Sequence, residues 1–276
     1  MTNEATSTDG GIQSLLDIMR QLRDPDSGCP WDLKQNFHSI VPYTIEETYE
    51  LVDAIAAQDF AQIRDELGDV LFQVVFYSQM AKEQGLFSFD DVVNGISRKL
   101  LRRHPHVFAK PDERQVPEQE VKERWEQIKG EERQQKNQVG ALDDVPRALP
   151  ALSRSQKLQK RAARVGFDWS ELGAVREKVD EELGELSEAV SDGDSEAIES
   201  EMGDVFLAMV NLARHLGVDA EAALRQANRR FEDRFRLMET AAERDGSQLG
   251  EESLERLEER WQAAKRELAA SASPLD

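Results

Sequence analysis

Several residue types are scarce in this sequence of 276 residues, and each scarcity excludes a class of protein. A single cysteine, Cys29, excludes a framework of intrachain disulfides and is typical of a reducing cytosol. No run of apolar residues approaches the roughly 18 that a membrane span needs. The first eleven residues lack a basic segment followed by an apolar one, so we expect no signal peptide. A soluble, cytoplasmic protein with no membrane partner is therefore expected.

Positive charge is also in short supply, because 35 Lys and Arg stand against 55 Asp and Glu, which gives a formal net charge of −20. Sequence-independent binding to a polynucleotide depends on clustered Lys and Arg, so this balance argues against nucleic-acid polymers as partners. If the substrate is itself an anion, a metal cation must lie between it and the protein.

Apolar residues recur with the spacing of helices, whereas the strict alternation of strands is hard to find. Ile12, Leu15, Met19 and Leu22, for example, fall on one helix face. Gly and Pro number only 16 and 9 and lie between the periodic segments. The predicted fold class is all-α.

The sequence repeats itself at a shift of 135 residues. Residues 46–51 (EETYEL) align with 181–186 (EELGEL), and without a gap residues 66–70 (ELGDV) align with 201–205 (EMGDV). At a nearby shift, residues 123–125 align with 259–261, both ERW. We therefore expect two copies of one helical domain.

The expected organisation has five parts. They are a disordered tail at 1–11, a first domain at 12–130, a linker at 131–153, a second domain at 154–266 and a tail at 267–276. The linker assignment depends on a charged and amide-rich run followed by Pro146 and Pro150, which stop helices.

Two acid pairs recur in each copy with helical spacing. Glu182 and Glu185 share a helix face with Glu181 beside them, and Glu201 and Asp204 repeat this spacing on the next helix. A short turn between the helices allows them to run antiparallel, so four or five carboxylates are expected to converge. Such a cluster needs a bound cation to stay ionised, and oxygen ligands without His or Cys favour Mg²⁺ or Mn²⁺.

Other interpretations of the acids remain open. One EExxE string is usually a solvated helix face, although the repetition of both pairs is not explained by solvation. A di-iron carboxylate bundle needs Glu-x-x-His, whereas Glu188 and Asp204 occupy the corresponding positions here. A non-catalytic protein whose acidic faces dock a basic partner is the remaining alternative.

Basic and aromatic residues downstream of the acids suit a polyphosphate and a base. Arg230 and Arg234 lie one turn apart, as do Trp261 and Lys265. The alternative is structural, with the arginines paired to Glu232 or Glu239 and the indole in the core.

The motifs together resemble the all-α nucleoside triphosphate pyrophosphohydrolases of the MazG family. Glu-Glu-x-x-Glu followed sixteen residues later by Glu-x-x-Asp is similar to the family signature. So are residues 28–32 (GCPWD), 42–50 (PYTIEETYE), 102–108 (RRHPHVF) and 165–169 (VGFDW). The resemblance covers about residues 12–266. It implies a helical bundle, a homodimer and Mg²⁺-dependent cleavage of nucleoside triphosphates to monophosphate and pyrophosphate, over a broad range of ribo- and deoxynucleotides.

The resemblance also implies roles for individual residues. In the second copy it implies metal ligands at Glu182, Glu185, Glu201 and Asp204, with Glu181 activating or positioning water. The nucleotide would be held by Lys178, Arg230, Arg234, Trp261 and Lys265. The matching first-copy positions are the acids Glu47, Glu50, Glu66 and Asp69, with Lys99, Arg103, Trp125 and Lys129.

One difference separates the copies: Tyr43 stands where the second copy has Lys178. Because a missing cation weakens phosphate binding, we expect the second copy to be the active one and the first to be weaker or structural. The preferred base and sugar are not fixed by residue spacing.

Overall fold

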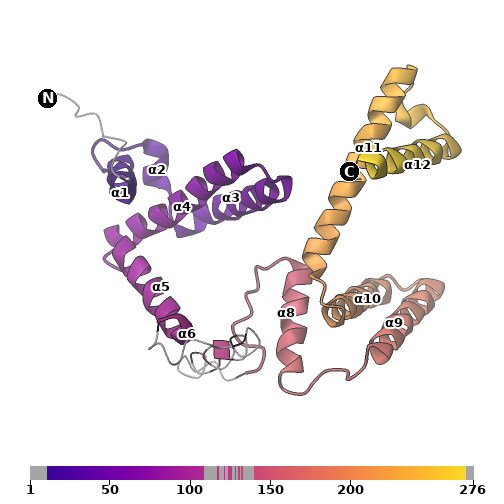
Figure 1. Cartoon of the computed structure of the whole chain (residues 1–276), viewed down its shortest axis with the longest axis horizontal. Helices are drawn as coiled ribbons and strands as arrows, with labels where there is room; N and C mark the ends of the chain where they lie inside the picture. Colours follow the sequence, from indigo (N-terminus) through magenta and orange to yellow (C-terminus); the bar gives the residue numbers. More distant parts are fainter. Residues whose placement is uncertain are drawn as a thin grey trace. The chain divides into compact units, whose positions relative to one another are not determined.

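The computed structural model describes residues 11–108 and 140–271, together with positions 117, 121, 124, 125, 128, 130 and 132. Within these ranges the regular structure is helical and includes no strand, which confirms the predicted all-α class. The chain divides into two compact units, Met1–Lys129 and Gly130–Asp276 (Figure 1). Of the tails predicted at 1–11 and 267–276, residues 1–10 and 272–276 lie outside the described residues, whereas residues 267–271 continue helix α12. Most of the predicted linker before residue 140 also lies outside the described residues.

The first unit is built around an antiparallel helix pair. Its helices are α1 (Gly11–Leu22), α2 (Pro30–Lys34), α3 (Phe37–Ala57), α4 (Phe60–Glu83), α5 (Phe89–Arg103) and α6 (Pro105–Phe108). Helices α3 and α4 pack along each other, and α1 and α5 both contact α4. The buried core joins α1, α3 and α4 through Met19, Ile40, Val75, Phe76 and Met80.

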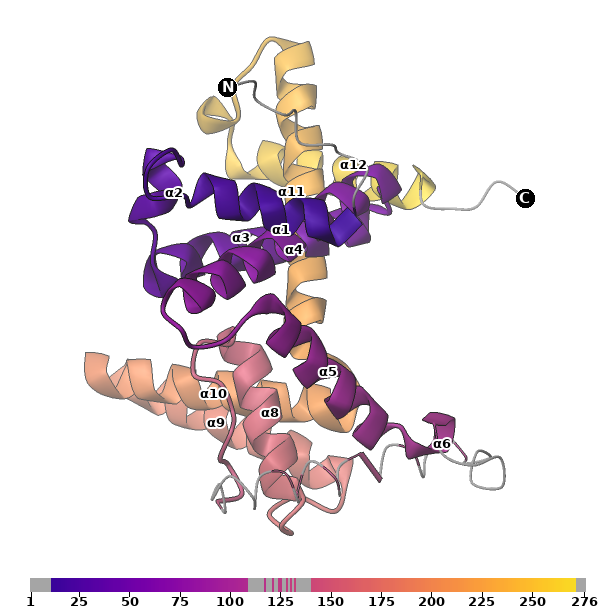
Figure 2. The same cartoon turned by 90° about the vertical axis from the view of Figure 1, so that its left-hand side faces the viewer.

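The second unit contains a similar pair. Its helices are α8 (Ala151–Ala163), α9 (Leu172–Asp192), α10 (Ser195–His215), α11 (Ala220–Asp245) and α12 (Leu254–Ser271), with a short 3₁₀ turn, η2 (Leu249–Glu251). Helix α8 lies against α10 and α11, and α12 folds back on α11 (Figure 2). Helix α8 begins directly after Pro150, three residues before the start that we expect for the second domain.

The turns of the two helix pairs are built alike. Helix α9 ends at Asp192 and is followed by Gly193, whose φ of 69° is left-handed. Asp194 then caps α10 by accepting hydrogen bonds from the N–H groups of Glu196 and Ala197. In the first unit, Gln58 with φ 56° and the capping Asp59 do the same between α3 and α4. These positions match at the same shift of 135. Because an antiparallel pair brings together residues equidistant from its turn, the turns place the acids of the two helices face to face.

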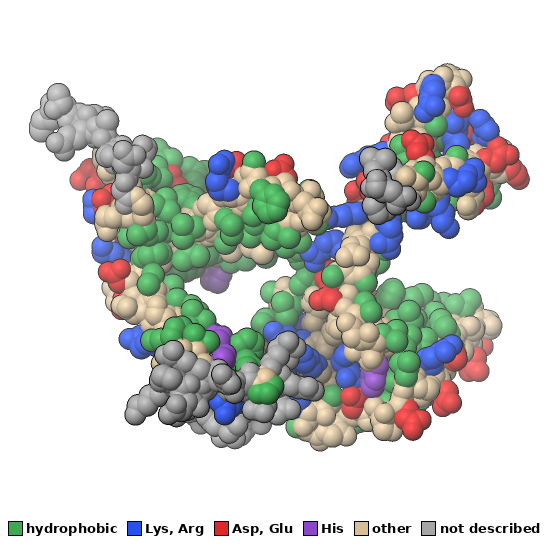
Figure 3. Space-filling model, in the orientation of Figure 1, with side chains coloured by type: hydrophobic (Ala, Val, Ile, Leu, Met, Phe, Trp, Pro, Cys, Tyr) green, Lys and Arg blue, Asp and Glu red, His purple; other side chains and the backbone are tan. Residues whose placement is uncertain are grey.

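Both helix pairs leave large apolar side chains on their surface. On α10, Met202, Phe206 and Met209 share one face by spacing, and Phe206 is 57% exposed. Figure 3 shows hydrophobic side chains gathered over the α3–α4 pair and over the α9–α10 pair. Contiguous patches of this kind mark surfaces that contact something else. None of the helices in the described part of the chain is long and apolar enough to cross a membrane.

Candidate active site

Three acids of the second unit converge as the spacing predicts. Glu182 comes from α9, and Glu201 and Asp204 come from α10. One carboxylate oxygen of each lies within 4.8 Å of the others. Glu182 is only 7% exposed, although a buried ionised carboxylate requires a compensating positive charge.

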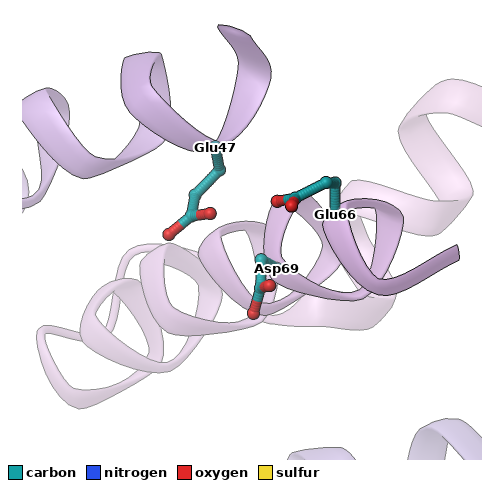
Figure 4. Close-up of side chains that lie close together, drawn as sticks. All are labelled: Glu47, Glu66 and Asp69. Atoms are coloured by element: carbon teal, nitrogen blue, oxygen red, sulfur yellow. The ribbon is translucent and has the colours of Figure 1, made fainter. Parts of the chain in front are cut away.

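The first unit repeats the arrangement. Glu47 of α3 points toward Glu66 and Asp69 of α4, again with oxygens within 4.8 Å of one another (Figure 4). The duplicated turn therefore reproduces the geometry of the acids as well as their order in the sequence.

The fourth predicted ligand of each cluster lies outside these groups of three. The cluster still affects Glu185. Loss of solvent is the largest cause of its raised pKa, followed by the charge of Glu182, and Glu201 contributes less. In the first unit, loss of solvent and the charge of Glu66 likewise raise the pKa of Glu50. Both glutamates are thus close enough to the clusters for the negative charge of the clusters to raise their pKa.

A lysine accompanies the cluster of the second unit. The ammonium of Lys178 lies 2.9 Å from Glu181 and 2.9 Å from Glu182, one turn along the same helix. These two carboxylates raise the pKa of Lys178, so it remains positively charged. In the first unit, Tyr43 occupies the corresponding position, and its ring packs edge-on against Trp31 at 5.7 Å. The described cluster of the first unit therefore lacks the cation that its counterpart has.

The donor sets fit a hard divalent cation. Each offers carboxylate oxygens alone, the ligand type of Mg²⁺ and Mn²⁺. Octahedral ligands about 2.1 Å from Mg²⁺ lie roughly 3 to 4 Å apart, so small side-chain rotations would bring the three oxygens to binding distance. In the second unit, Lys178 holds a compensating charge at the edge of the same cluster.

Apart from Lys178, the predicted nucleotide-binding residues lie on a different pair of helices, α11 and α12. The guanidinium of Arg234, on α11, lies over the indole of Trp261, on α12, at 5.3 Å from the ring centroid. Phe231 packs against the same indole at 5.3 Å. Of the acids considered as alternative partners of Arg230 and Arg234, Glu232 pairs with Arg236 in the described residues.

The structure does not bring these residues to the acid cluster within one chain. In the described residues no hydrogen bond or ion pair joins Arg230, Arg234 or Lys265 to the cluster, and α12 packs on α11 rather than on α9 or α10. Figure 1 shows α12 beside the part of α11 that extends away from the α9–α10 pair. The acidic and basic halves of the predicted site therefore lie on separate helix pairs.

The corresponding residues of the first unit are only partly described. Lys99 and Arg103 lie on α5, whereas Lys129 falls outside the described residues. The ring of His104 packs edge-on against Trp125 at 5.0 Å. In the second unit the corresponding tryptophan, Trp261, is covered by Arg234, whose first-copy counterpart Arg103 directly precedes His104. The sequence comparison does not single out His104 for this contact.

Two ion-pair networks of the second unit were also missed from the sequence. Asp168 accepts hydrogen bonds from Arg214 at 3.0 Å and pairs with His215, which ties the loop before α9 to the end of α10. Arg260 pairs with Glu252 across the turn between α11 and α12. Asp168 and Arg260 each match a residue of the first copy, but their partners are too distant in sequence to be inferred from helical spacing.

The fold and the acid clusters define an all-α protein built of two helix pairs, each with a carboxylate site suited to a divalent cation. Comparison with known proteins gives the family. The model of the MazG nucleotide pyrophosphohydrolase domain matches twice, at residues 35–108 and 172–236. Each match contains all four predicted acids of its copy. The chain belongs to the MazG family, which confirms the predicted family and its enzyme class.

Individual relatives agree with this assignment. The chain is 56% identical over 258 residues to a nucleoside triphosphate pyrophosphohydrolase of Escherichia coli K12, covering 93% of this chain and 97% of the relative. It is 44% identical over 256 residues to the nucleoside triphosphate pyrophosphohydrolase/pyrophosphatase MazG of Thermotoga maritima, covering 92% and 95%. It is also 45% identical over 249 residues to the uncharacterized protein YabN of Bacillus subtilis, covering 90% of this chain and 50% of YabN.

Proposed function

We propose that this protein hydrolyses nucleoside triphosphates at the α-phosphorus in an Mg²⁺-dependent reaction that yields a nucleoside monophosphate and pyrophosphate. Mn²⁺ is a candidate substitute for Mg²⁺, and a broad range of ribo- and deoxynucleotides is expected. The observation that carries the proposal is the convergence of Glu182, Glu201 and Asp204 in a chain of this family.

The acids of the second unit have separate roles in the proposed reaction. Glu182, Glu185, Glu201 and Asp204 would hold Mg²⁺, which would neutralise charge on the phosphate oxygens. Glu181 positions the attacking water and accepts its proton. The water oxygen bonds to the α-phosphorus, the bond from that phosphorus to the oxygen bridging to the β-phosphate breaks, and pyrophosphate leaves.

The nucleotide is held by the remaining predicted residues. Lys178 moves from its acid partners to a phosphate oxygen, and Arg230, Arg234 and Lys265 bind the polyphosphate. The indole of Trp261 stacks on the base. ATP binding belongs to the same proposal.

A homodimer would bring the two halves of the site together. The halves lie on separate helix pairs of one chain. The helix pair that carries the acids exposes an apolar stripe on α10, formed by Met202, Phe206 and Met209. Packing of that stripe against a second copy would bury it and allow basic residues of the partner to approach the acids. The single cysteine supports a cytoplasmic location for this assembly.

The test is hydrolysis of a panel of common and modified nucleoside triphosphates in ¹⁸O-labelled water with Mg²⁺. Attack at the α-phosphorus places the label in the monophosphate, whereas attack at the β-phosphorus places it in pyrophosphate. Replacing Asp204 with Ala should abolish pyrophosphate release, while Glu199→Ala, an exposed acid on the same helix, should not. An unchanged rate for Asp204→Ala, or label in the pyrophosphate, would overturn the proposal.

A further inference from the structure

A buried ion pair closes the turn between α11 and α12. The guanidinium of Arg260 donates two hydrogen bonds of 2.6 Å to the carboxylate of Glu252, and the two side chains are 6% and 8% exposed. Arg260 also donates to the hydroxyl of Ser247 at 3.2 Å and lies 3.0 Å from Asp245 at the end of α11. A bidentate pair with further partners has one well-defined geometry, which a single lysine contact does not provide.

The apolar part of the same interface specifies little by itself. The buried apolar residues of the two helices are Met238 and Ala242 on α11 and Ala264 on α12, and the half-buried Trp261 packs against Phe231. Alanine and methionine side chains pack acceptably in more than one register, because they offer no directional contact. A buried polar pair is the kind of element that selects one register among these.

The pair also determines where the neighbouring indole points. Arg260 and Trp261 are successive residues of α12, so their side chains leave the helix about 100° apart. With Arg260 held toward the turn, Trp261 lies beneath the guanidinium of Arg234 and beside Phe231. The indole then forms one wall of an open pocket of about 420 Å³, which Phe231, Phe235, Met238, Leu249 and Leu257 also line.

Arg234 depends on the same arrangement. Its Nε atom is buried and has no hydrogen-bond partner in the described residues, and its guanidinium lies over the indole. A rotation of α12 that moved the indole would therefore release Arg234 as well.

In the first-copy sequence, the arginine has a counterpart but Glu252 does not at the same shift. At the shift of 136 that aligns the two ERW motifs, Arg124 corresponds to Arg260, whereas Val116 corresponds to Glu252 and Pro111 to Ser247. This network is that of the second copy, where Lys178 also accompanies the acid cluster.

We infer that the Glu252–Arg260 pair is a positioning element for nucleotide binding, which fixes the rotation of α12 so that Trp261 and Arg234 together form the base-binding side of the site. This inference rests on the proposed function. Neither residue of the pair touches the substrate, so the pair acts on affinity and leaves the chemistry at the acid cluster unchanged.

The test compares Glu252→Gln and Arg260→Lys with the control Arg256→Gln in the full chain. Arg256 pairs with the same Asp245 at 3.3 Å but is half exposed, so its loss removes a surface ion pair from the same turn. For each protein, kcat and KM are measured for Mg²⁺-dependent pyrophosphate release from ATP, and Kd is measured by calorimetry with an α,β-methylene analogue of ATP.

In both variants of the buried pair, KM and Kd should rise about tenfold while kcat at saturating ATP stays within about threefold, because the loss is one of positioned binding. Arg256→Gln should match the wild type. Unchanged KM and Kd in both variants would overturn the inference, as would a fall of kcat with KM unchanged, which indicates general loss of folded protein. Failure of the proposed function is distinct, because the wild type itself would then release no pyrophosphate.

Discussion

The ammonium of Lys178 lies 2.9 Å from the carboxylate of Glu182, one of the three acids that converge between α9 and α10. The first unit has the same three acids but Tyr43 in place of the lysine. This relationship leads to an asymmetry between the two copies that mutation can measure. The same replacement, glutamate by alanine, can be made at equivalent positions of the two clusters.

Glu185→Ala should reduce kcat/KM for pyrophosphate release by at least about 100-fold, whereas Glu50→Ala should reduce it by less than about threefold. The reason is that Lys178 accompanies the second cluster, whereas Tyr43 occupies the corresponding position beside the first. Lys178→Met should lower kcat/KM by about 10- to 100-fold, the effect of one lost charged contact. Equal losses for Glu50→Ala and Glu185→Ala would refute this ranking of the copies.

Mg²⁺ should stabilise the second unit against heat. A ligand that binds only the folded state, present at 100 times its Kd, adds about 2.7 kcal/mol to the free energy of unfolding. Differential scanning calorimetry with and without Mg²⁺ measures this shift in Tm. The double variant Glu182→Gln with Asp204→Asn should lose it, while Glu199→Gln should keep it. A protein whose acidic faces merely dock a basic partner would show no such Mg²⁺-specific shift in the wild type.

Asp168 should make stability depend on pH in the acid range. The hydrogen bonds from Arg214, with a smaller contribution from His215, lower the pKa of Asp168 from 3.8 to about 2. A carboxyl group whose pKa is lower in the folded than in the unfolded protein stabilises the fold above the unfolded value, and this contribution is lost as the pH falls toward the folded value. Asp168→Asn should therefore lower the unfolding free energy at pH 7, with a difference that shrinks between about pH 4 and pH 2.

Urea unfolding over this pH range checks the prediction. Asp180→Asn is the control, because Asp180 is an exposed residue of α9 outside this network. A difference between wild type and Asp168→Asn that persists unchanged at pH 2 would contradict the role given to the ion pair.

Phe206 should contribute to self-association. Phe206→Lys places a charge in the centre of the apolar stripe on α10, and burying that charge in an interface is unfavourable. Sedimentation velocity should show the wild type as a dimer and the variant as a monomer with reduced pyrophosphate release. Phe167→Lys, at a more exposed position in the loop before α9, should leave the sedimentation coefficient unchanged. A monomeric wild type would contradict the proposed dimer.

Gln58 should limit the stability of the first unit. Its φ of 56° is left-handed, a conformation that costs a residue with a β-carbon about 1 to 2 kcal/mol, whereas glycine adopts it freely. Glycine also loses more backbone entropy on folding, which offsets part of this gain. The net effect of Gln58→Gly should be to stabilise the first unit by about 0.5 to 1 kcal/mol. The reverse change in the second unit, Gly193→Gln, should destabilise it. Thermal unfolding of both variants measures these changes in stability, and a lower Tm for Gln58→Gly would contradict the prediction.

The sequence predicted the helices and the converging acids well because both depend on local spacing. Glu182 and Asp204 lie nearly equidistant from the turn at Gly193 and Asp194, and Glu201 is one helical turn from Asp204, so an antiparallel pair brings the three acids together. The contact between Lys178 and Glu182 follows from their spacing of four residues on one helix. Because the first copy has the same acids at the same spacing, the repeat predicts the same arrangement there.

By itself, the sequence determined the fold class, the family, the duplication and the identity of the acids, since periodicity and motif spacing act within one helix or across one short turn. The tertiary structure decided what depends on the rotation and packing of whole helices. It left Glu185 outside the group of three, separated Arg234 and Trp261 from the acids, and paired Arg260 with Glu252 eight residues away, where no helical repeat brings two side chains together. These contacts depend on directional side-chain packing between elements, which residue spacing does not specify.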